Sequence, residues 1–293
     1  SHQTGNVTET VLWSEDFANG IPAGWQNYGT AQGVADPDAK WEYRGPQTTP
    51  NTSVGSRGAY SGVSTNPNYT SINSATKSNG FVVFDSDYLD NAAIAGNFCG
   101  AGGTPVLACA PHEANLETTV IDLSNNTQVD LKFTQYYRRF AGPGGVQSVP
   151  ATYIDFSTNG GLSWFGNVMV NSNISVNSAT PANDLVNLSI GSYVGGHDSV
   201  KIRFRFEGDY YFWQLDDIQL VGTPNHRLEF TFGSNGTKQD IYFSNSANKP
   251  KNGHFTLSQN RSIQFRTNVR NTGLLSQNIQ LLINIYDQLG NLV

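Results

Sequence analysis

The sequence predicts an all-β protein that contains a large β-sandwich followed by a smaller Ig-like one. Charged residues make up only 14% of the chain and hydrophobic residues 38%, whereas Gly, Asn, Ser and Thr are abundant. Many short runs alternate apolar and polar residues and are separated by turn residues, which is the pattern of half-buried strands. No segment has a convincing helical periodicity. Together these observations favour a sandwich of many strands joined by turns.

The clearest strands lie in the second half of the large sandwich. The run 200–206 alternates strictly, with apolar residues facing inward and Lys or Arg facing outward. The run 129–138 begins with the same alternation. Asn159-Gly160-Gly161 separates two further apolar runs, 151–157 and 163–170. Because Asn-Gly between two such runs is a strong hairpin signal, we expect them to pair.

The first half of the chain is less regular. The apolar run 80–85 predicts a strand that continues through residue 90. Residues 26–80 are mostly Asn, Ser, Thr, Gly and Pro, and only 40–44 and 58–60 can form short strands. A run this long without strong periodicity is usually functional loop or decoration on a β scaffold.

Three segments are expected along the chain. Ser1 and His2 are typical of a tag remnant, so residues 1–9 are expected to be a tag remnant and linker. Residues 10–222 form the large sandwich. Residues 223–293 hold several short runs, at 239–243, 253–257, 262–270 and 278–286. These runs favour a small Ig-like sandwich, of which residues 223–293 can be a truncated part.

Composition and charge exclude some classes of function. The net charge of −6 argues against nucleic-acid binding, which needs clustered Lys and Arg. The surplus of carboxylates suits hard cations instead. No stretch of apolar residues is long enough to span a membrane. The composition favours a secreted or cell-surface location, and we expect a monomeric module.

The two cysteines, Cys99 and Cys109, bracket one Gly-rich stretch. A pair this close around a flexible loop predicts a disulfide, whose closure contributes roughly 2–3 kcal/mol by the chain-entropy estimate. The alternative is two free thiols in a cytosolic protein, which the extracellular composition disfavours. Zinc would need four N or S ligands, and only His112 is near.

The strand 210–221 poses the main question, because it carries two adjacent carboxylates, Asp216 and Asp217, between apolar residues. A charge removed from water is costly unless it is paired or bound to a metal. Alternation places the two carboxylates on opposite faces, so both can enter one site only at a bulge. Which of the two would bind a metal stays open.

The order of four motifs resembles a known family. Residues 14–25 are similar to the opening "E-x-F-x-x-G-[IL]-P-x-x-W", and 116–124 to an "L-x-[ST]-x-x-[IL]-D-L-S" element. Residues 153–164 are similar to a "Y-[IV]-x-[FYV]-S-[TS]-[ND]-G-G-x-[ST]-W" hairpin, and 200–221 to the closing strands. This order resembles the bacterial cleaved-adhesin and MAM-like domains of secreted surface proteins.

The resemblance implies a jelly-roll of two antiparallel sheets without catalytic machinery, stabilised by structural Ca²⁺. It implies a non-catalytic adhesion module of a larger secreted or cell-surface bacterial protein that binds a glycan or a protein. The alternative is an accessory domain of a secreted protease or glycosidase, used for substrate targeting or structure. The insertion at 26–80 and the cysteine loop depart from the family pattern.

Two carboxylate groups are candidate Ca²⁺ sites. Terminal strands of a jelly-roll commonly lie side by side, so one site can join the first and last strands. Because Ca²⁺ takes 6–8 oxygen ligands, including carbonyls and waters, two or three carboxylates suffice. A second site can form at the end of the strand 80–85, where two aspartates spaced two residues apart point to the same side. The candidates are Glu15, Asp16, Asp216 and Asp217 for the first site, and Asp85 and Asp87, with Asp90, for the second. The structural alternatives are an Asp bonded to backbone N–H groups and a solvated acidic loop.

Aromatic and arginine side chains are the candidates for ligand binding, because sugars stack on aromatic faces and polar groups bind their hydroxyls. They are Trp41, Tyr43, Tyr136, Tyr137, Arg138, Trp164 and Tyr210. One tyrosine and one arginine of 136–139 are expected on a concave face with the outward residues of 200–206. The alternative for any one of these aromatics is core packing.

Catalysis has little support in the sequence. Neither a G-x-S-x-G elbow nor an H-E-x-x-H motif occurs. A glycosidase would need two carboxylates about 5–10 Å apart across a cleft, and Asp155 and Glu207 are the candidates.

Overall fold

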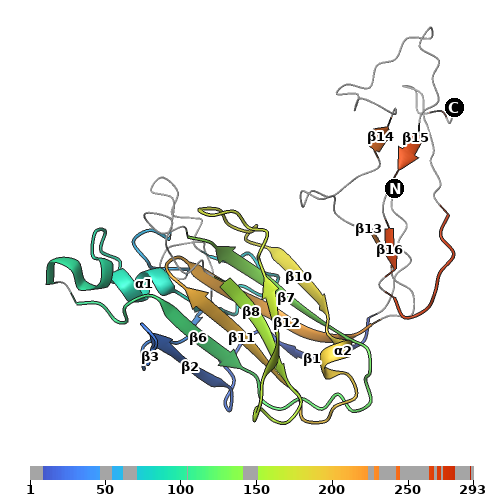
Figure 1. Cartoon of the computed structure of the whole chain (residues 1–293), viewed down its shortest axis with the longest axis horizontal. Helices are drawn as coiled ribbons and strands as arrows, with labels where there is room; N and C mark the ends of the chain where they lie inside the picture. Colours follow the sequence, from blue (N-terminus) through green and yellow to red (C-terminus); the bar gives the residue numbers. More distant parts are fainter. Residues whose placement is uncertain are drawn as a thin grey trace, which may run out of the picture. The chain divides into compact units, whose positions relative to one another are not determined.

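The structure is a computed structural model that describes residues 9–46, 55–61, 71–103, 105–140, 151–223, 228–230, 242–244, 264–266, 269–271, 273–280 and 291. The chain divides into two compact units. One is Glu9–Gly222, and the other combines Ser1–Thr8 with Thr223–Val293. The fold is all-β, with two six-stranded antiparallel sheets and little helix (Figure 1). Among the described residues, none of the helices has the length and apolar character needed to cross a membrane.

One sheet, which we call sheet A, has the strand order β10-β7-β12-β5-β4, and β1 also pairs with β12. Its strands are β1 (Val11–Glu15), β4 (Glu42–Arg44), β5 (Phe81–Phe84), β7 (Val129–Arg138), β10 (Asp184–Ser189) and β12 (Phe212–Gly222). β5 pairs with the first part of β12 and β1 with its last part. The first and last strands of this unit therefore lie side by side, as the family resemblance implied.

The other sheet, sheet B, has the order β3-β2-β6-β11-β8-β9. Its strands are β2 (Gln26–Ala31), β3 (Val34–Ala35), β6 (His112–Glu117), β8 (Ala151–Ser157), β9 (Phe165–Val170) and β11 (Lys201–Gly208). The predicted hairpin is confirmed, because β8 pairs with β9 across a turn in which Gly160 and Gly161 have φ angles of 72° and 96°. The expectation that 26–31 is irregular was wrong, since these weakly periodic residues form a strand by pairing with β6.

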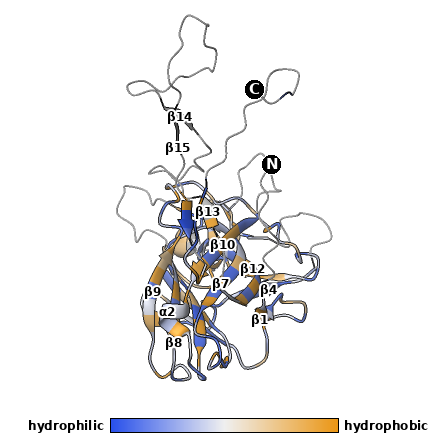
Figure 2. Cartoon of the chain, turned by 90° about the vertical axis from the view of Figure 1, so that its right-hand side faces the viewer, coloured by the Kyte–Doolittle hydropathy of each residue, from blue (hydrophilic) through white to orange (hydrophobic). Residues whose placement is uncertain are grey.

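The main core lies between the two sheets. Phe133 of β7 packs edge-on against Phe204 of β11, with ring centroids 5.5 Å apart. Phe84 of β5 lies 4.9 Å from Phe206 of β11. All four rings are fully buried, and burial of each contributes about 1.5–3 kcal/mol. Hydrophobic and hydrophilic residues follow one another as bands along the labelled strands (Figure 2), as expected where one strand face meets this core.

Sheet A has a second buried face. Ile72, Phe81, Tyr136 and Phe212 form a separate apolar cluster with Val83 and Tyr211, against which Tyr60 also packs. Ile72 and Tyr60 come from the segment predicted as loop decoration. This segment therefore covers sheet A, which explains why every residue of β5 is buried.

A β-bulge interrupts β12 at its two carboxylates. The pairing of β12 with β7 shifts register between Asp216 and Gln219, and Asp217 has a φ angle of 51°. As a result Leu215 and Ile218 both face the main core. Simple alternation, which puts Ile218 on the face opposite Leu215, is wrong here because the bulge adds one residue.

A short helix follows β5 where the sequence predicted continuing strand. α1 (Ser86–Asn91) begins after Asp85, whose side chain caps it, and ends at Ala92 in the left-handed conformation. Two further helices are short: η2 (Phe98–Gly103), of 3₁₀ type, and α2 (Gly191–Val194). Cys99 and Cys109 form the predicted disulfide, with Cα atoms 5.0 Å apart. Figure 1 shows α1 and α2 at opposite ends of the sandwich.

In the second unit the described strands pair antiparallel as two short ladders, β13 (Leu228–Phe230) with β16 (Val269–Asn271) and β14 (Tyr242–Ser244) with β15 (Gln264–Arg266). The predicted run 253–257 and most of 278–286 lie outside the described residues. The Ig-like arrangement therefore stays a prediction, as do the domain boundaries.

Candidate functional site

The face of sheet B that points away from the core carries a ladder of charged and aromatic side chains, which we call the sheet B outer face. Along β11, Ile202, Phe204 and Phe206 are fully buried in the core. The alternate residues Arg203 and Arg205 therefore point to the other side. Two rows cross the sheet beside them. One row is Tyr28, Asn115, Arg205, Tyr153 and Met169, and the other is Gln26, Glu117, Arg203 and Asp155.

Each of the two arginines on this face stacks on an aromatic ring. The guanidinium carbon of Arg203 lies 4.4 Å from the ring centroid of Trp164. That of Arg205 lies 4.3 Å from the ring of Tyr153. Asp155 accepts hydrogen bonds from both, at 2.8 Å from Arg203 Nη2 and 2.8 Å from Arg205 Nε. Because each arginine is fixed by a ring and a carboxylate, the face is ordered before any ligand arrives.

The edges of the same face are polar and partly exposed. Tyr28 is 43% exposed and donates to Glu117 Oε1 at 2.7 Å. Met169, on the far edge, is 47% exposed. Between them Arg205 Nη2 donates to Asn167 Oδ1 at 2.7 Å, while Asn115 is buried and its Oδ1 has no hydrogen-bond partner. The face thus offers apolar surfaces beside fixed donors and acceptors.

Acidic side chains balance the cations of this face. Glu117 lies 3.6 Å from Lys201 Nζ and 3.9 Å from a terminal nitrogen of Arg203. Glu207 pairs with Arg205. Asp155, one of the two carboxylates considered for a glycosidase, is 1% exposed in its side chain and bound by two arginines. That pairing favours a structural role for Asp155.

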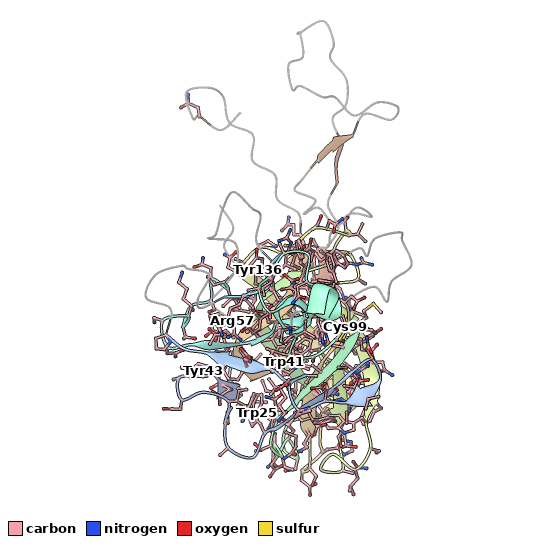
Figure 3. All side chains as sticks on the ribbon, turned by 90° about the vertical axis from the view of Figure 1, so that its left-hand side faces the viewer. Trp25, Trp41, Tyr43, Arg57, Cys99 and Tyr136 are labelled. Atoms are coloured by element: carbon pink, nitrogen blue, oxygen red, sulfur yellow. A yellow bond between two sulfur atoms is a disulfide. The ribbon has the colours of Figure 1, made fainter. Side chains whose placement is uncertain are left out.

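The predicted ligand-binding residues fall into different places. Trp41, Tyr136 and Tyr137 are at most 4% exposed, so they pack in the core instead of offering a surface. Trp41 contacts Phe84 and Trp213 and lies among the strands in Figure 3. The expectation that 136–139 share a face with 200–206 is wrong, because β7 belongs to sheet A and β11 to sheet B.

The other predicted ligand-binding residues are partly accessible or lie at an edge. Tyr43 is half-buried and its hydroxyl donates to Asn79 O at 2.8 Å. Arg138 Nη1 donates to Ser61 O at 2.5 Å and its guanidinium stacks on Tyr211. Tyr210 is 9% exposed. Of the predicted set, only Trp164 lies on the sheet B outer face.

Sequence reasoning did not single out Tyr153, Tyr28 or Asn115. The sequence signal for this face was the alternation in 200–206, which correctly predicted that Arg203 and Arg205 point outward. Their neighbours depend on which strands flank β11, and these are β6 and β8, far apart in sequence.

Because of the bulge in β12, the side chains of Asp216 and Asp217 both bind residues 74–76. Thr76 Oγ1 donates to Asp217 Oδ1 at 2.6 Å and lies 3.2 Å from Asp216 Oδ2. Ser74 Oγ also donates to Asp216, and Ala75 N donates to Asp217 Oδ2 at 2.9 Å. Burial raises the pKa of Asp216 to about 7, although the Ser74 hydroxyl opposes the shift. The two carboxylates therefore hold residues 74–76 against sheet A.

Hard oxygen atoms suited to Ca²⁺ lie at and beside this junction. In β1, Glu15 Oε1 accepts Phe17 N at 2.7 Å. Asp16 Oδ2 accepts Asn79 Nδ2 at 3.1 Å, and the buried Oδ1 of Asn79 has no partner. Such an orphaned acceptor fits a cation ligand, so the donor types match the group that the resemblance implies. The site itself stays a prediction.

The second carboxylate pair also has protein donors. Asp85 accepts hydrogen bonds from Ser56 Oγ and from Arg57 N, at 2.5 and 2.6 Å. Asp87 Oδ2 accepts Tyr60 N at 2.7 Å. Burial raises the pKa of Asp85 to about 6 and that of Asp87 to about 7. These contacts hold residues 55–61 on α1, and metal binding by Asp85 and Asp87 stays a prediction.

A Ser–His pair connects α1 with β6. Ser86 Oγ and His112 Nδ1 are 2.8 Å apart, and His112 Nε2 lies 3.2 Å from Ala108 O. Both side chains are buried, and burial lowers the pKa of His112. A neutral ring that donates to Ala108 and accepts from Ser86 satisfies both contacts, which is a structural arrangement.

The fold defines a two-sheet antiparallel β-sandwich, and its sheet B outer face is an ordered ladder that is buried at Asn115 and Asp155 and exposed at Tyr28 and Met169. No protein-family model and no curated protein matches the sequence. Among solved structures, the K1 cleaved adhesin domain of Lys-gingipain from Porphyromonas gingivalis W83 is similar at 17% identity and a TM-score of 0.37, covering 72% of this chain and 98% of that one.

Two further structures are similar at the same level. The K3 cleaved adhesin domain of the same protein has 16% identity and a TM-score of 0.36, over 73% of this chain and 99% of that one. TmCBM61 in complex with beta-1,4-galactotriose has 14% identity and a TM-score of 0.33, covering 70% of this chain and 92% of that one. Similarity this distant carries no conclusion about ligand or activity.

Proposed function

We propose that residues Glu9–Gly222 are a non-catalytic, calcium-stabilised adhesion or binding module of a larger secreted or cell-surface bacterial protein. Its ligand is a glycan or a surface protein, bound on the sheet B outer face. The observation that carries this proposal is the arrangement of Arg203 on Trp164 and Arg205 on Tyr153, with Asp155 bonded to both arginines.

The chemistry of this face favours a neutral glycan. Ring faces and arginine stems give apolar surface for the C–H groups of a sugar, and the fixed side chains give donors and acceptors for its hydroxyls. The ion pairs of Arg203 and Arg205 balance the charge, so a charged ligand would gain little. Since these side chains are already ordered, binding would cost less conformational entropy.

The test is glycan-array binding of the wild type and of Trp164→Ala. We expect the substitution to weaken binding about tenfold, because a stacked aromatic side chain is typical of residues that dominate binding energy. The matched control is Leu162→Ala, since Leu162 is 89% exposed in the turn of the same hairpin. Equal binding by wild type and Trp164→Ala would place the ligand elsewhere.

Calcium is the second part of the proposal. Asp216 and Asp217, which both bind Thr76, would hold the ion together with backbone carbonyls and waters, and its charge would stabilise the Asp216 carboxylate that burial otherwise disfavours. The ion would fasten the last strand of the unit to residues 74–76.

Thermal melts in Ca²⁺ and in EDTA test the ion. Ligand linkage at a thousandfold excess over Kd stabilises a fold by about 4 kcal/mol, so the melting temperature should rise by several degrees in Ca²⁺. Asp217→Asn should abolish most of this rise, whereas Asp198→Asn, on an exposed loop, should keep it. Identical wild-type melts in both buffers would contradict the metal.

A further inference from the structure

The end of the sandwich that carries α1 and the disulfide presents an apolar surface. Figure 3 looks onto this end, where the labelled Cys99 lies beside the helix. Ile94 is 46% exposed, Phe98 51% and Leu107 44%. The loop that carries them is fastened by the disulfide and by hydrogen bonds from Leu107 N and Ala108 N to Leu89 O, at 3.1 and 3.0 Å. These apolar side chains are therefore held outward by a fixed backbone.

Aromatic rings continue this surface, and we call the whole the disulfide-loop patch: Tyr60, Ile94, Phe98, Leu107, Phe140 and Tyr210. Phe98 stacks on Tyr60 with centroids 5.7 Å apart and planes at 5°. Tyr210 meets Phe98 edge-on at 6.1 Å, and Phe140 lies 4.7 Å from Tyr210. Phe98 is half-exposed despite these contacts, so part of its ring is free for a partner.

Buried carboxylates lie behind the rings. Asp90 Oδ2 accepts a hydrogen bond from the Tyr210 hydroxyl at 2.7 Å. Burial is the main cause of the raised pKa of Tyr210, and the nearby Asp90, Asp87 and Asp209 raise it further. Asp209 is 7% exposed and its Oδ1 has no hydrogen-bond partner. The Oδ1 of Asn97, a residue that is 2% exposed and precedes Phe98, also has none. Two buried acceptors from separate segments therefore lack a donor.

Nearby cations do not supply that donor. No charged residue occurs between Asp90 and His112 in the sequence, so the loop carries no positive charge of its own. Arg57 stacks on Tyr88 and pairs with Glu42. Arg138 stacks on Tyr211 and donates to the carbonyls of residues 60 and 61. The patch therefore combines the exposed ring of Phe98 and its exposed apolar neighbours with negative charge that the described cations leave unmatched.

We propose that the disulfide-loop patch binds a lysine or arginine side chain of a partner protein. The methylene stem of such a side chain covers apolar surface while its head stays polar. A cation over an aromatic face is attracted by the ring quadrupole, and the carboxylates behind the rings add to that attraction.

Other ligands match the patch less well. A neutral sugar would use the rings but not the negative charge. For a metal, the one group of three candidate ligand atoms among the described residues is Asp90 with Cys99 and Cys109, whose sulfurs are joined in the disulfide. This patch is also separate from the sheet B outer face, so the two binding sites can be tested independently.

The test uses the full chain and a labelled peptide of lysines spaced by glycine, with its lysine-acetylated form as the uncharged probe. Fluorescence anisotropy should show binding of the lysine peptide only, weakening between about 20 and about 150 mM salt because charges attract less when screened. Phe98→Ala and Asp209→Asn should each weaken binding about fivefold or more. Leu162→Ala, which removes an exposed apolar side chain elsewhere, should leave it unchanged.

Circular dichroism of each variant separates loss of binding from loss of folding. Phe98→Lys gives a second check, because a cation placed on the patch should exclude the peptide while the fold is retained. Equal binding of the acetylated peptide, wild-type affinity in Phe98→Ala, or loss of array-detected glycan binding in Phe98→Ala would each overturn the proposal. Displacement of the peptide by Ca²⁺ but not by Mg²⁺ at equal ionic strength would reassign the site to a metal.

Discussion

At the scale of single residues, carboxylates in this protein fasten loop segments to sheet A and to α1. Asp216 and Asp217 bind residues 74–76, and Asp85 and Asp87 bind residues 55–61. The sequence identified these acids as groups that need partners. It could not show that backbone N–H groups and hydroxyls of a distant segment are the partners, since 142 residues separate Ser74 from Asp216.

Replacing Asp216 by Ala should destabilise the protein by about 2–3 kcal/mol, because the buried Ser74 hydroxyl would lose its acceptor and the hydrogen bond from the backbone N of Asp217 would also be lost. Urea unfolding measures this loss as a lower midpoint at an unchanged slope. Asp198→Ala, which removes an exposed carboxylate bonded to its neighbour Ser199, should cost almost nothing. Similar midpoints for the two variants would contradict the assigned role of Asp216.

At the scale of elements, the covering of sheet A depends on close approach between residues 55–61 and α1. A Cβ atom added at Gly58 would lie 2.1 Å from Asp87 Oδ2 and 2.4 Å from Asp87 Cβ. Asp87 is fully buried, so it has little room to move. Glycine at this position therefore allows the segment to reach the helix, and Tyr60 to reach the apolar cluster on sheet A.

Gly58→Ala should cost about 1–3 kcal/mol, the usual penalty for forcing atoms into a packed site. Gly45→Ala is the control, because its added Cβ would have 3.9 Å to its nearest neighbour and no positive φ is involved. Hydrogen exchange should show faster exchange in 55–61 and α1 for the Gly58 variant alone. Unchanged exchange in that variant would show that the close approach is not needed.

At the scale of the whole Glu9–Gly222 unit, the two sheets have different surroundings. Sheet A is covered by loop segments on the side away from the core, and sheet B has a charged and aromatic outer face there. Burial next to these coverings leaves several carboxyl groups with raised pKa values. Stability should therefore depend on pH through groups that are costly to ionise in the folded state.

Asp209 allows this dependence to be measured. Burial, and then the charge of Asp90, raise its pKa from 3.8 to about 6. The pKa of Asp209 is higher in the folded than in the unfolded protein. Its favourable contribution to folding stability is therefore fully present below pH 3.8, where the carboxyl is protonated, and is lost as the pH rises through about 6. Asp209→Asn should thus be more stable than wild type at pH 7.5, by about 1 kcal/mol, and not at pH 4. Melts at both pH values measure this, and an equal effect at both would contradict the raised pKa.

Much of the fold could be predicted from the sequence because it depends on local patterns. Strict alternation in 200–206, the Asn159-Gly160 turn and the spacing of the two cysteines are each set by neighbours along the chain. β2 and α1 were missed, because the first is a strand only through pairing with β6 and the second follows a strand without any helical period. Of the predicted binding residues, Trp164 alone reached the open face.

By itself the sequence determined the all-β class, the disulfide and the outward position of Arg203 and Arg205, whereas the neighbouring first and last strands were implied only by the family resemblance. Only the tertiary structure decided what surrounds them. Residues 55–61 and 71–76 cover one sheet, and the outer face of the other carries the charged and aromatic ladder. One added residue in β12 turns Asp216 and Asp217 to the same side. The physical reason is that alternation specifies two faces of a strand, whereas pairing and packing between distant segments specify what each face meets.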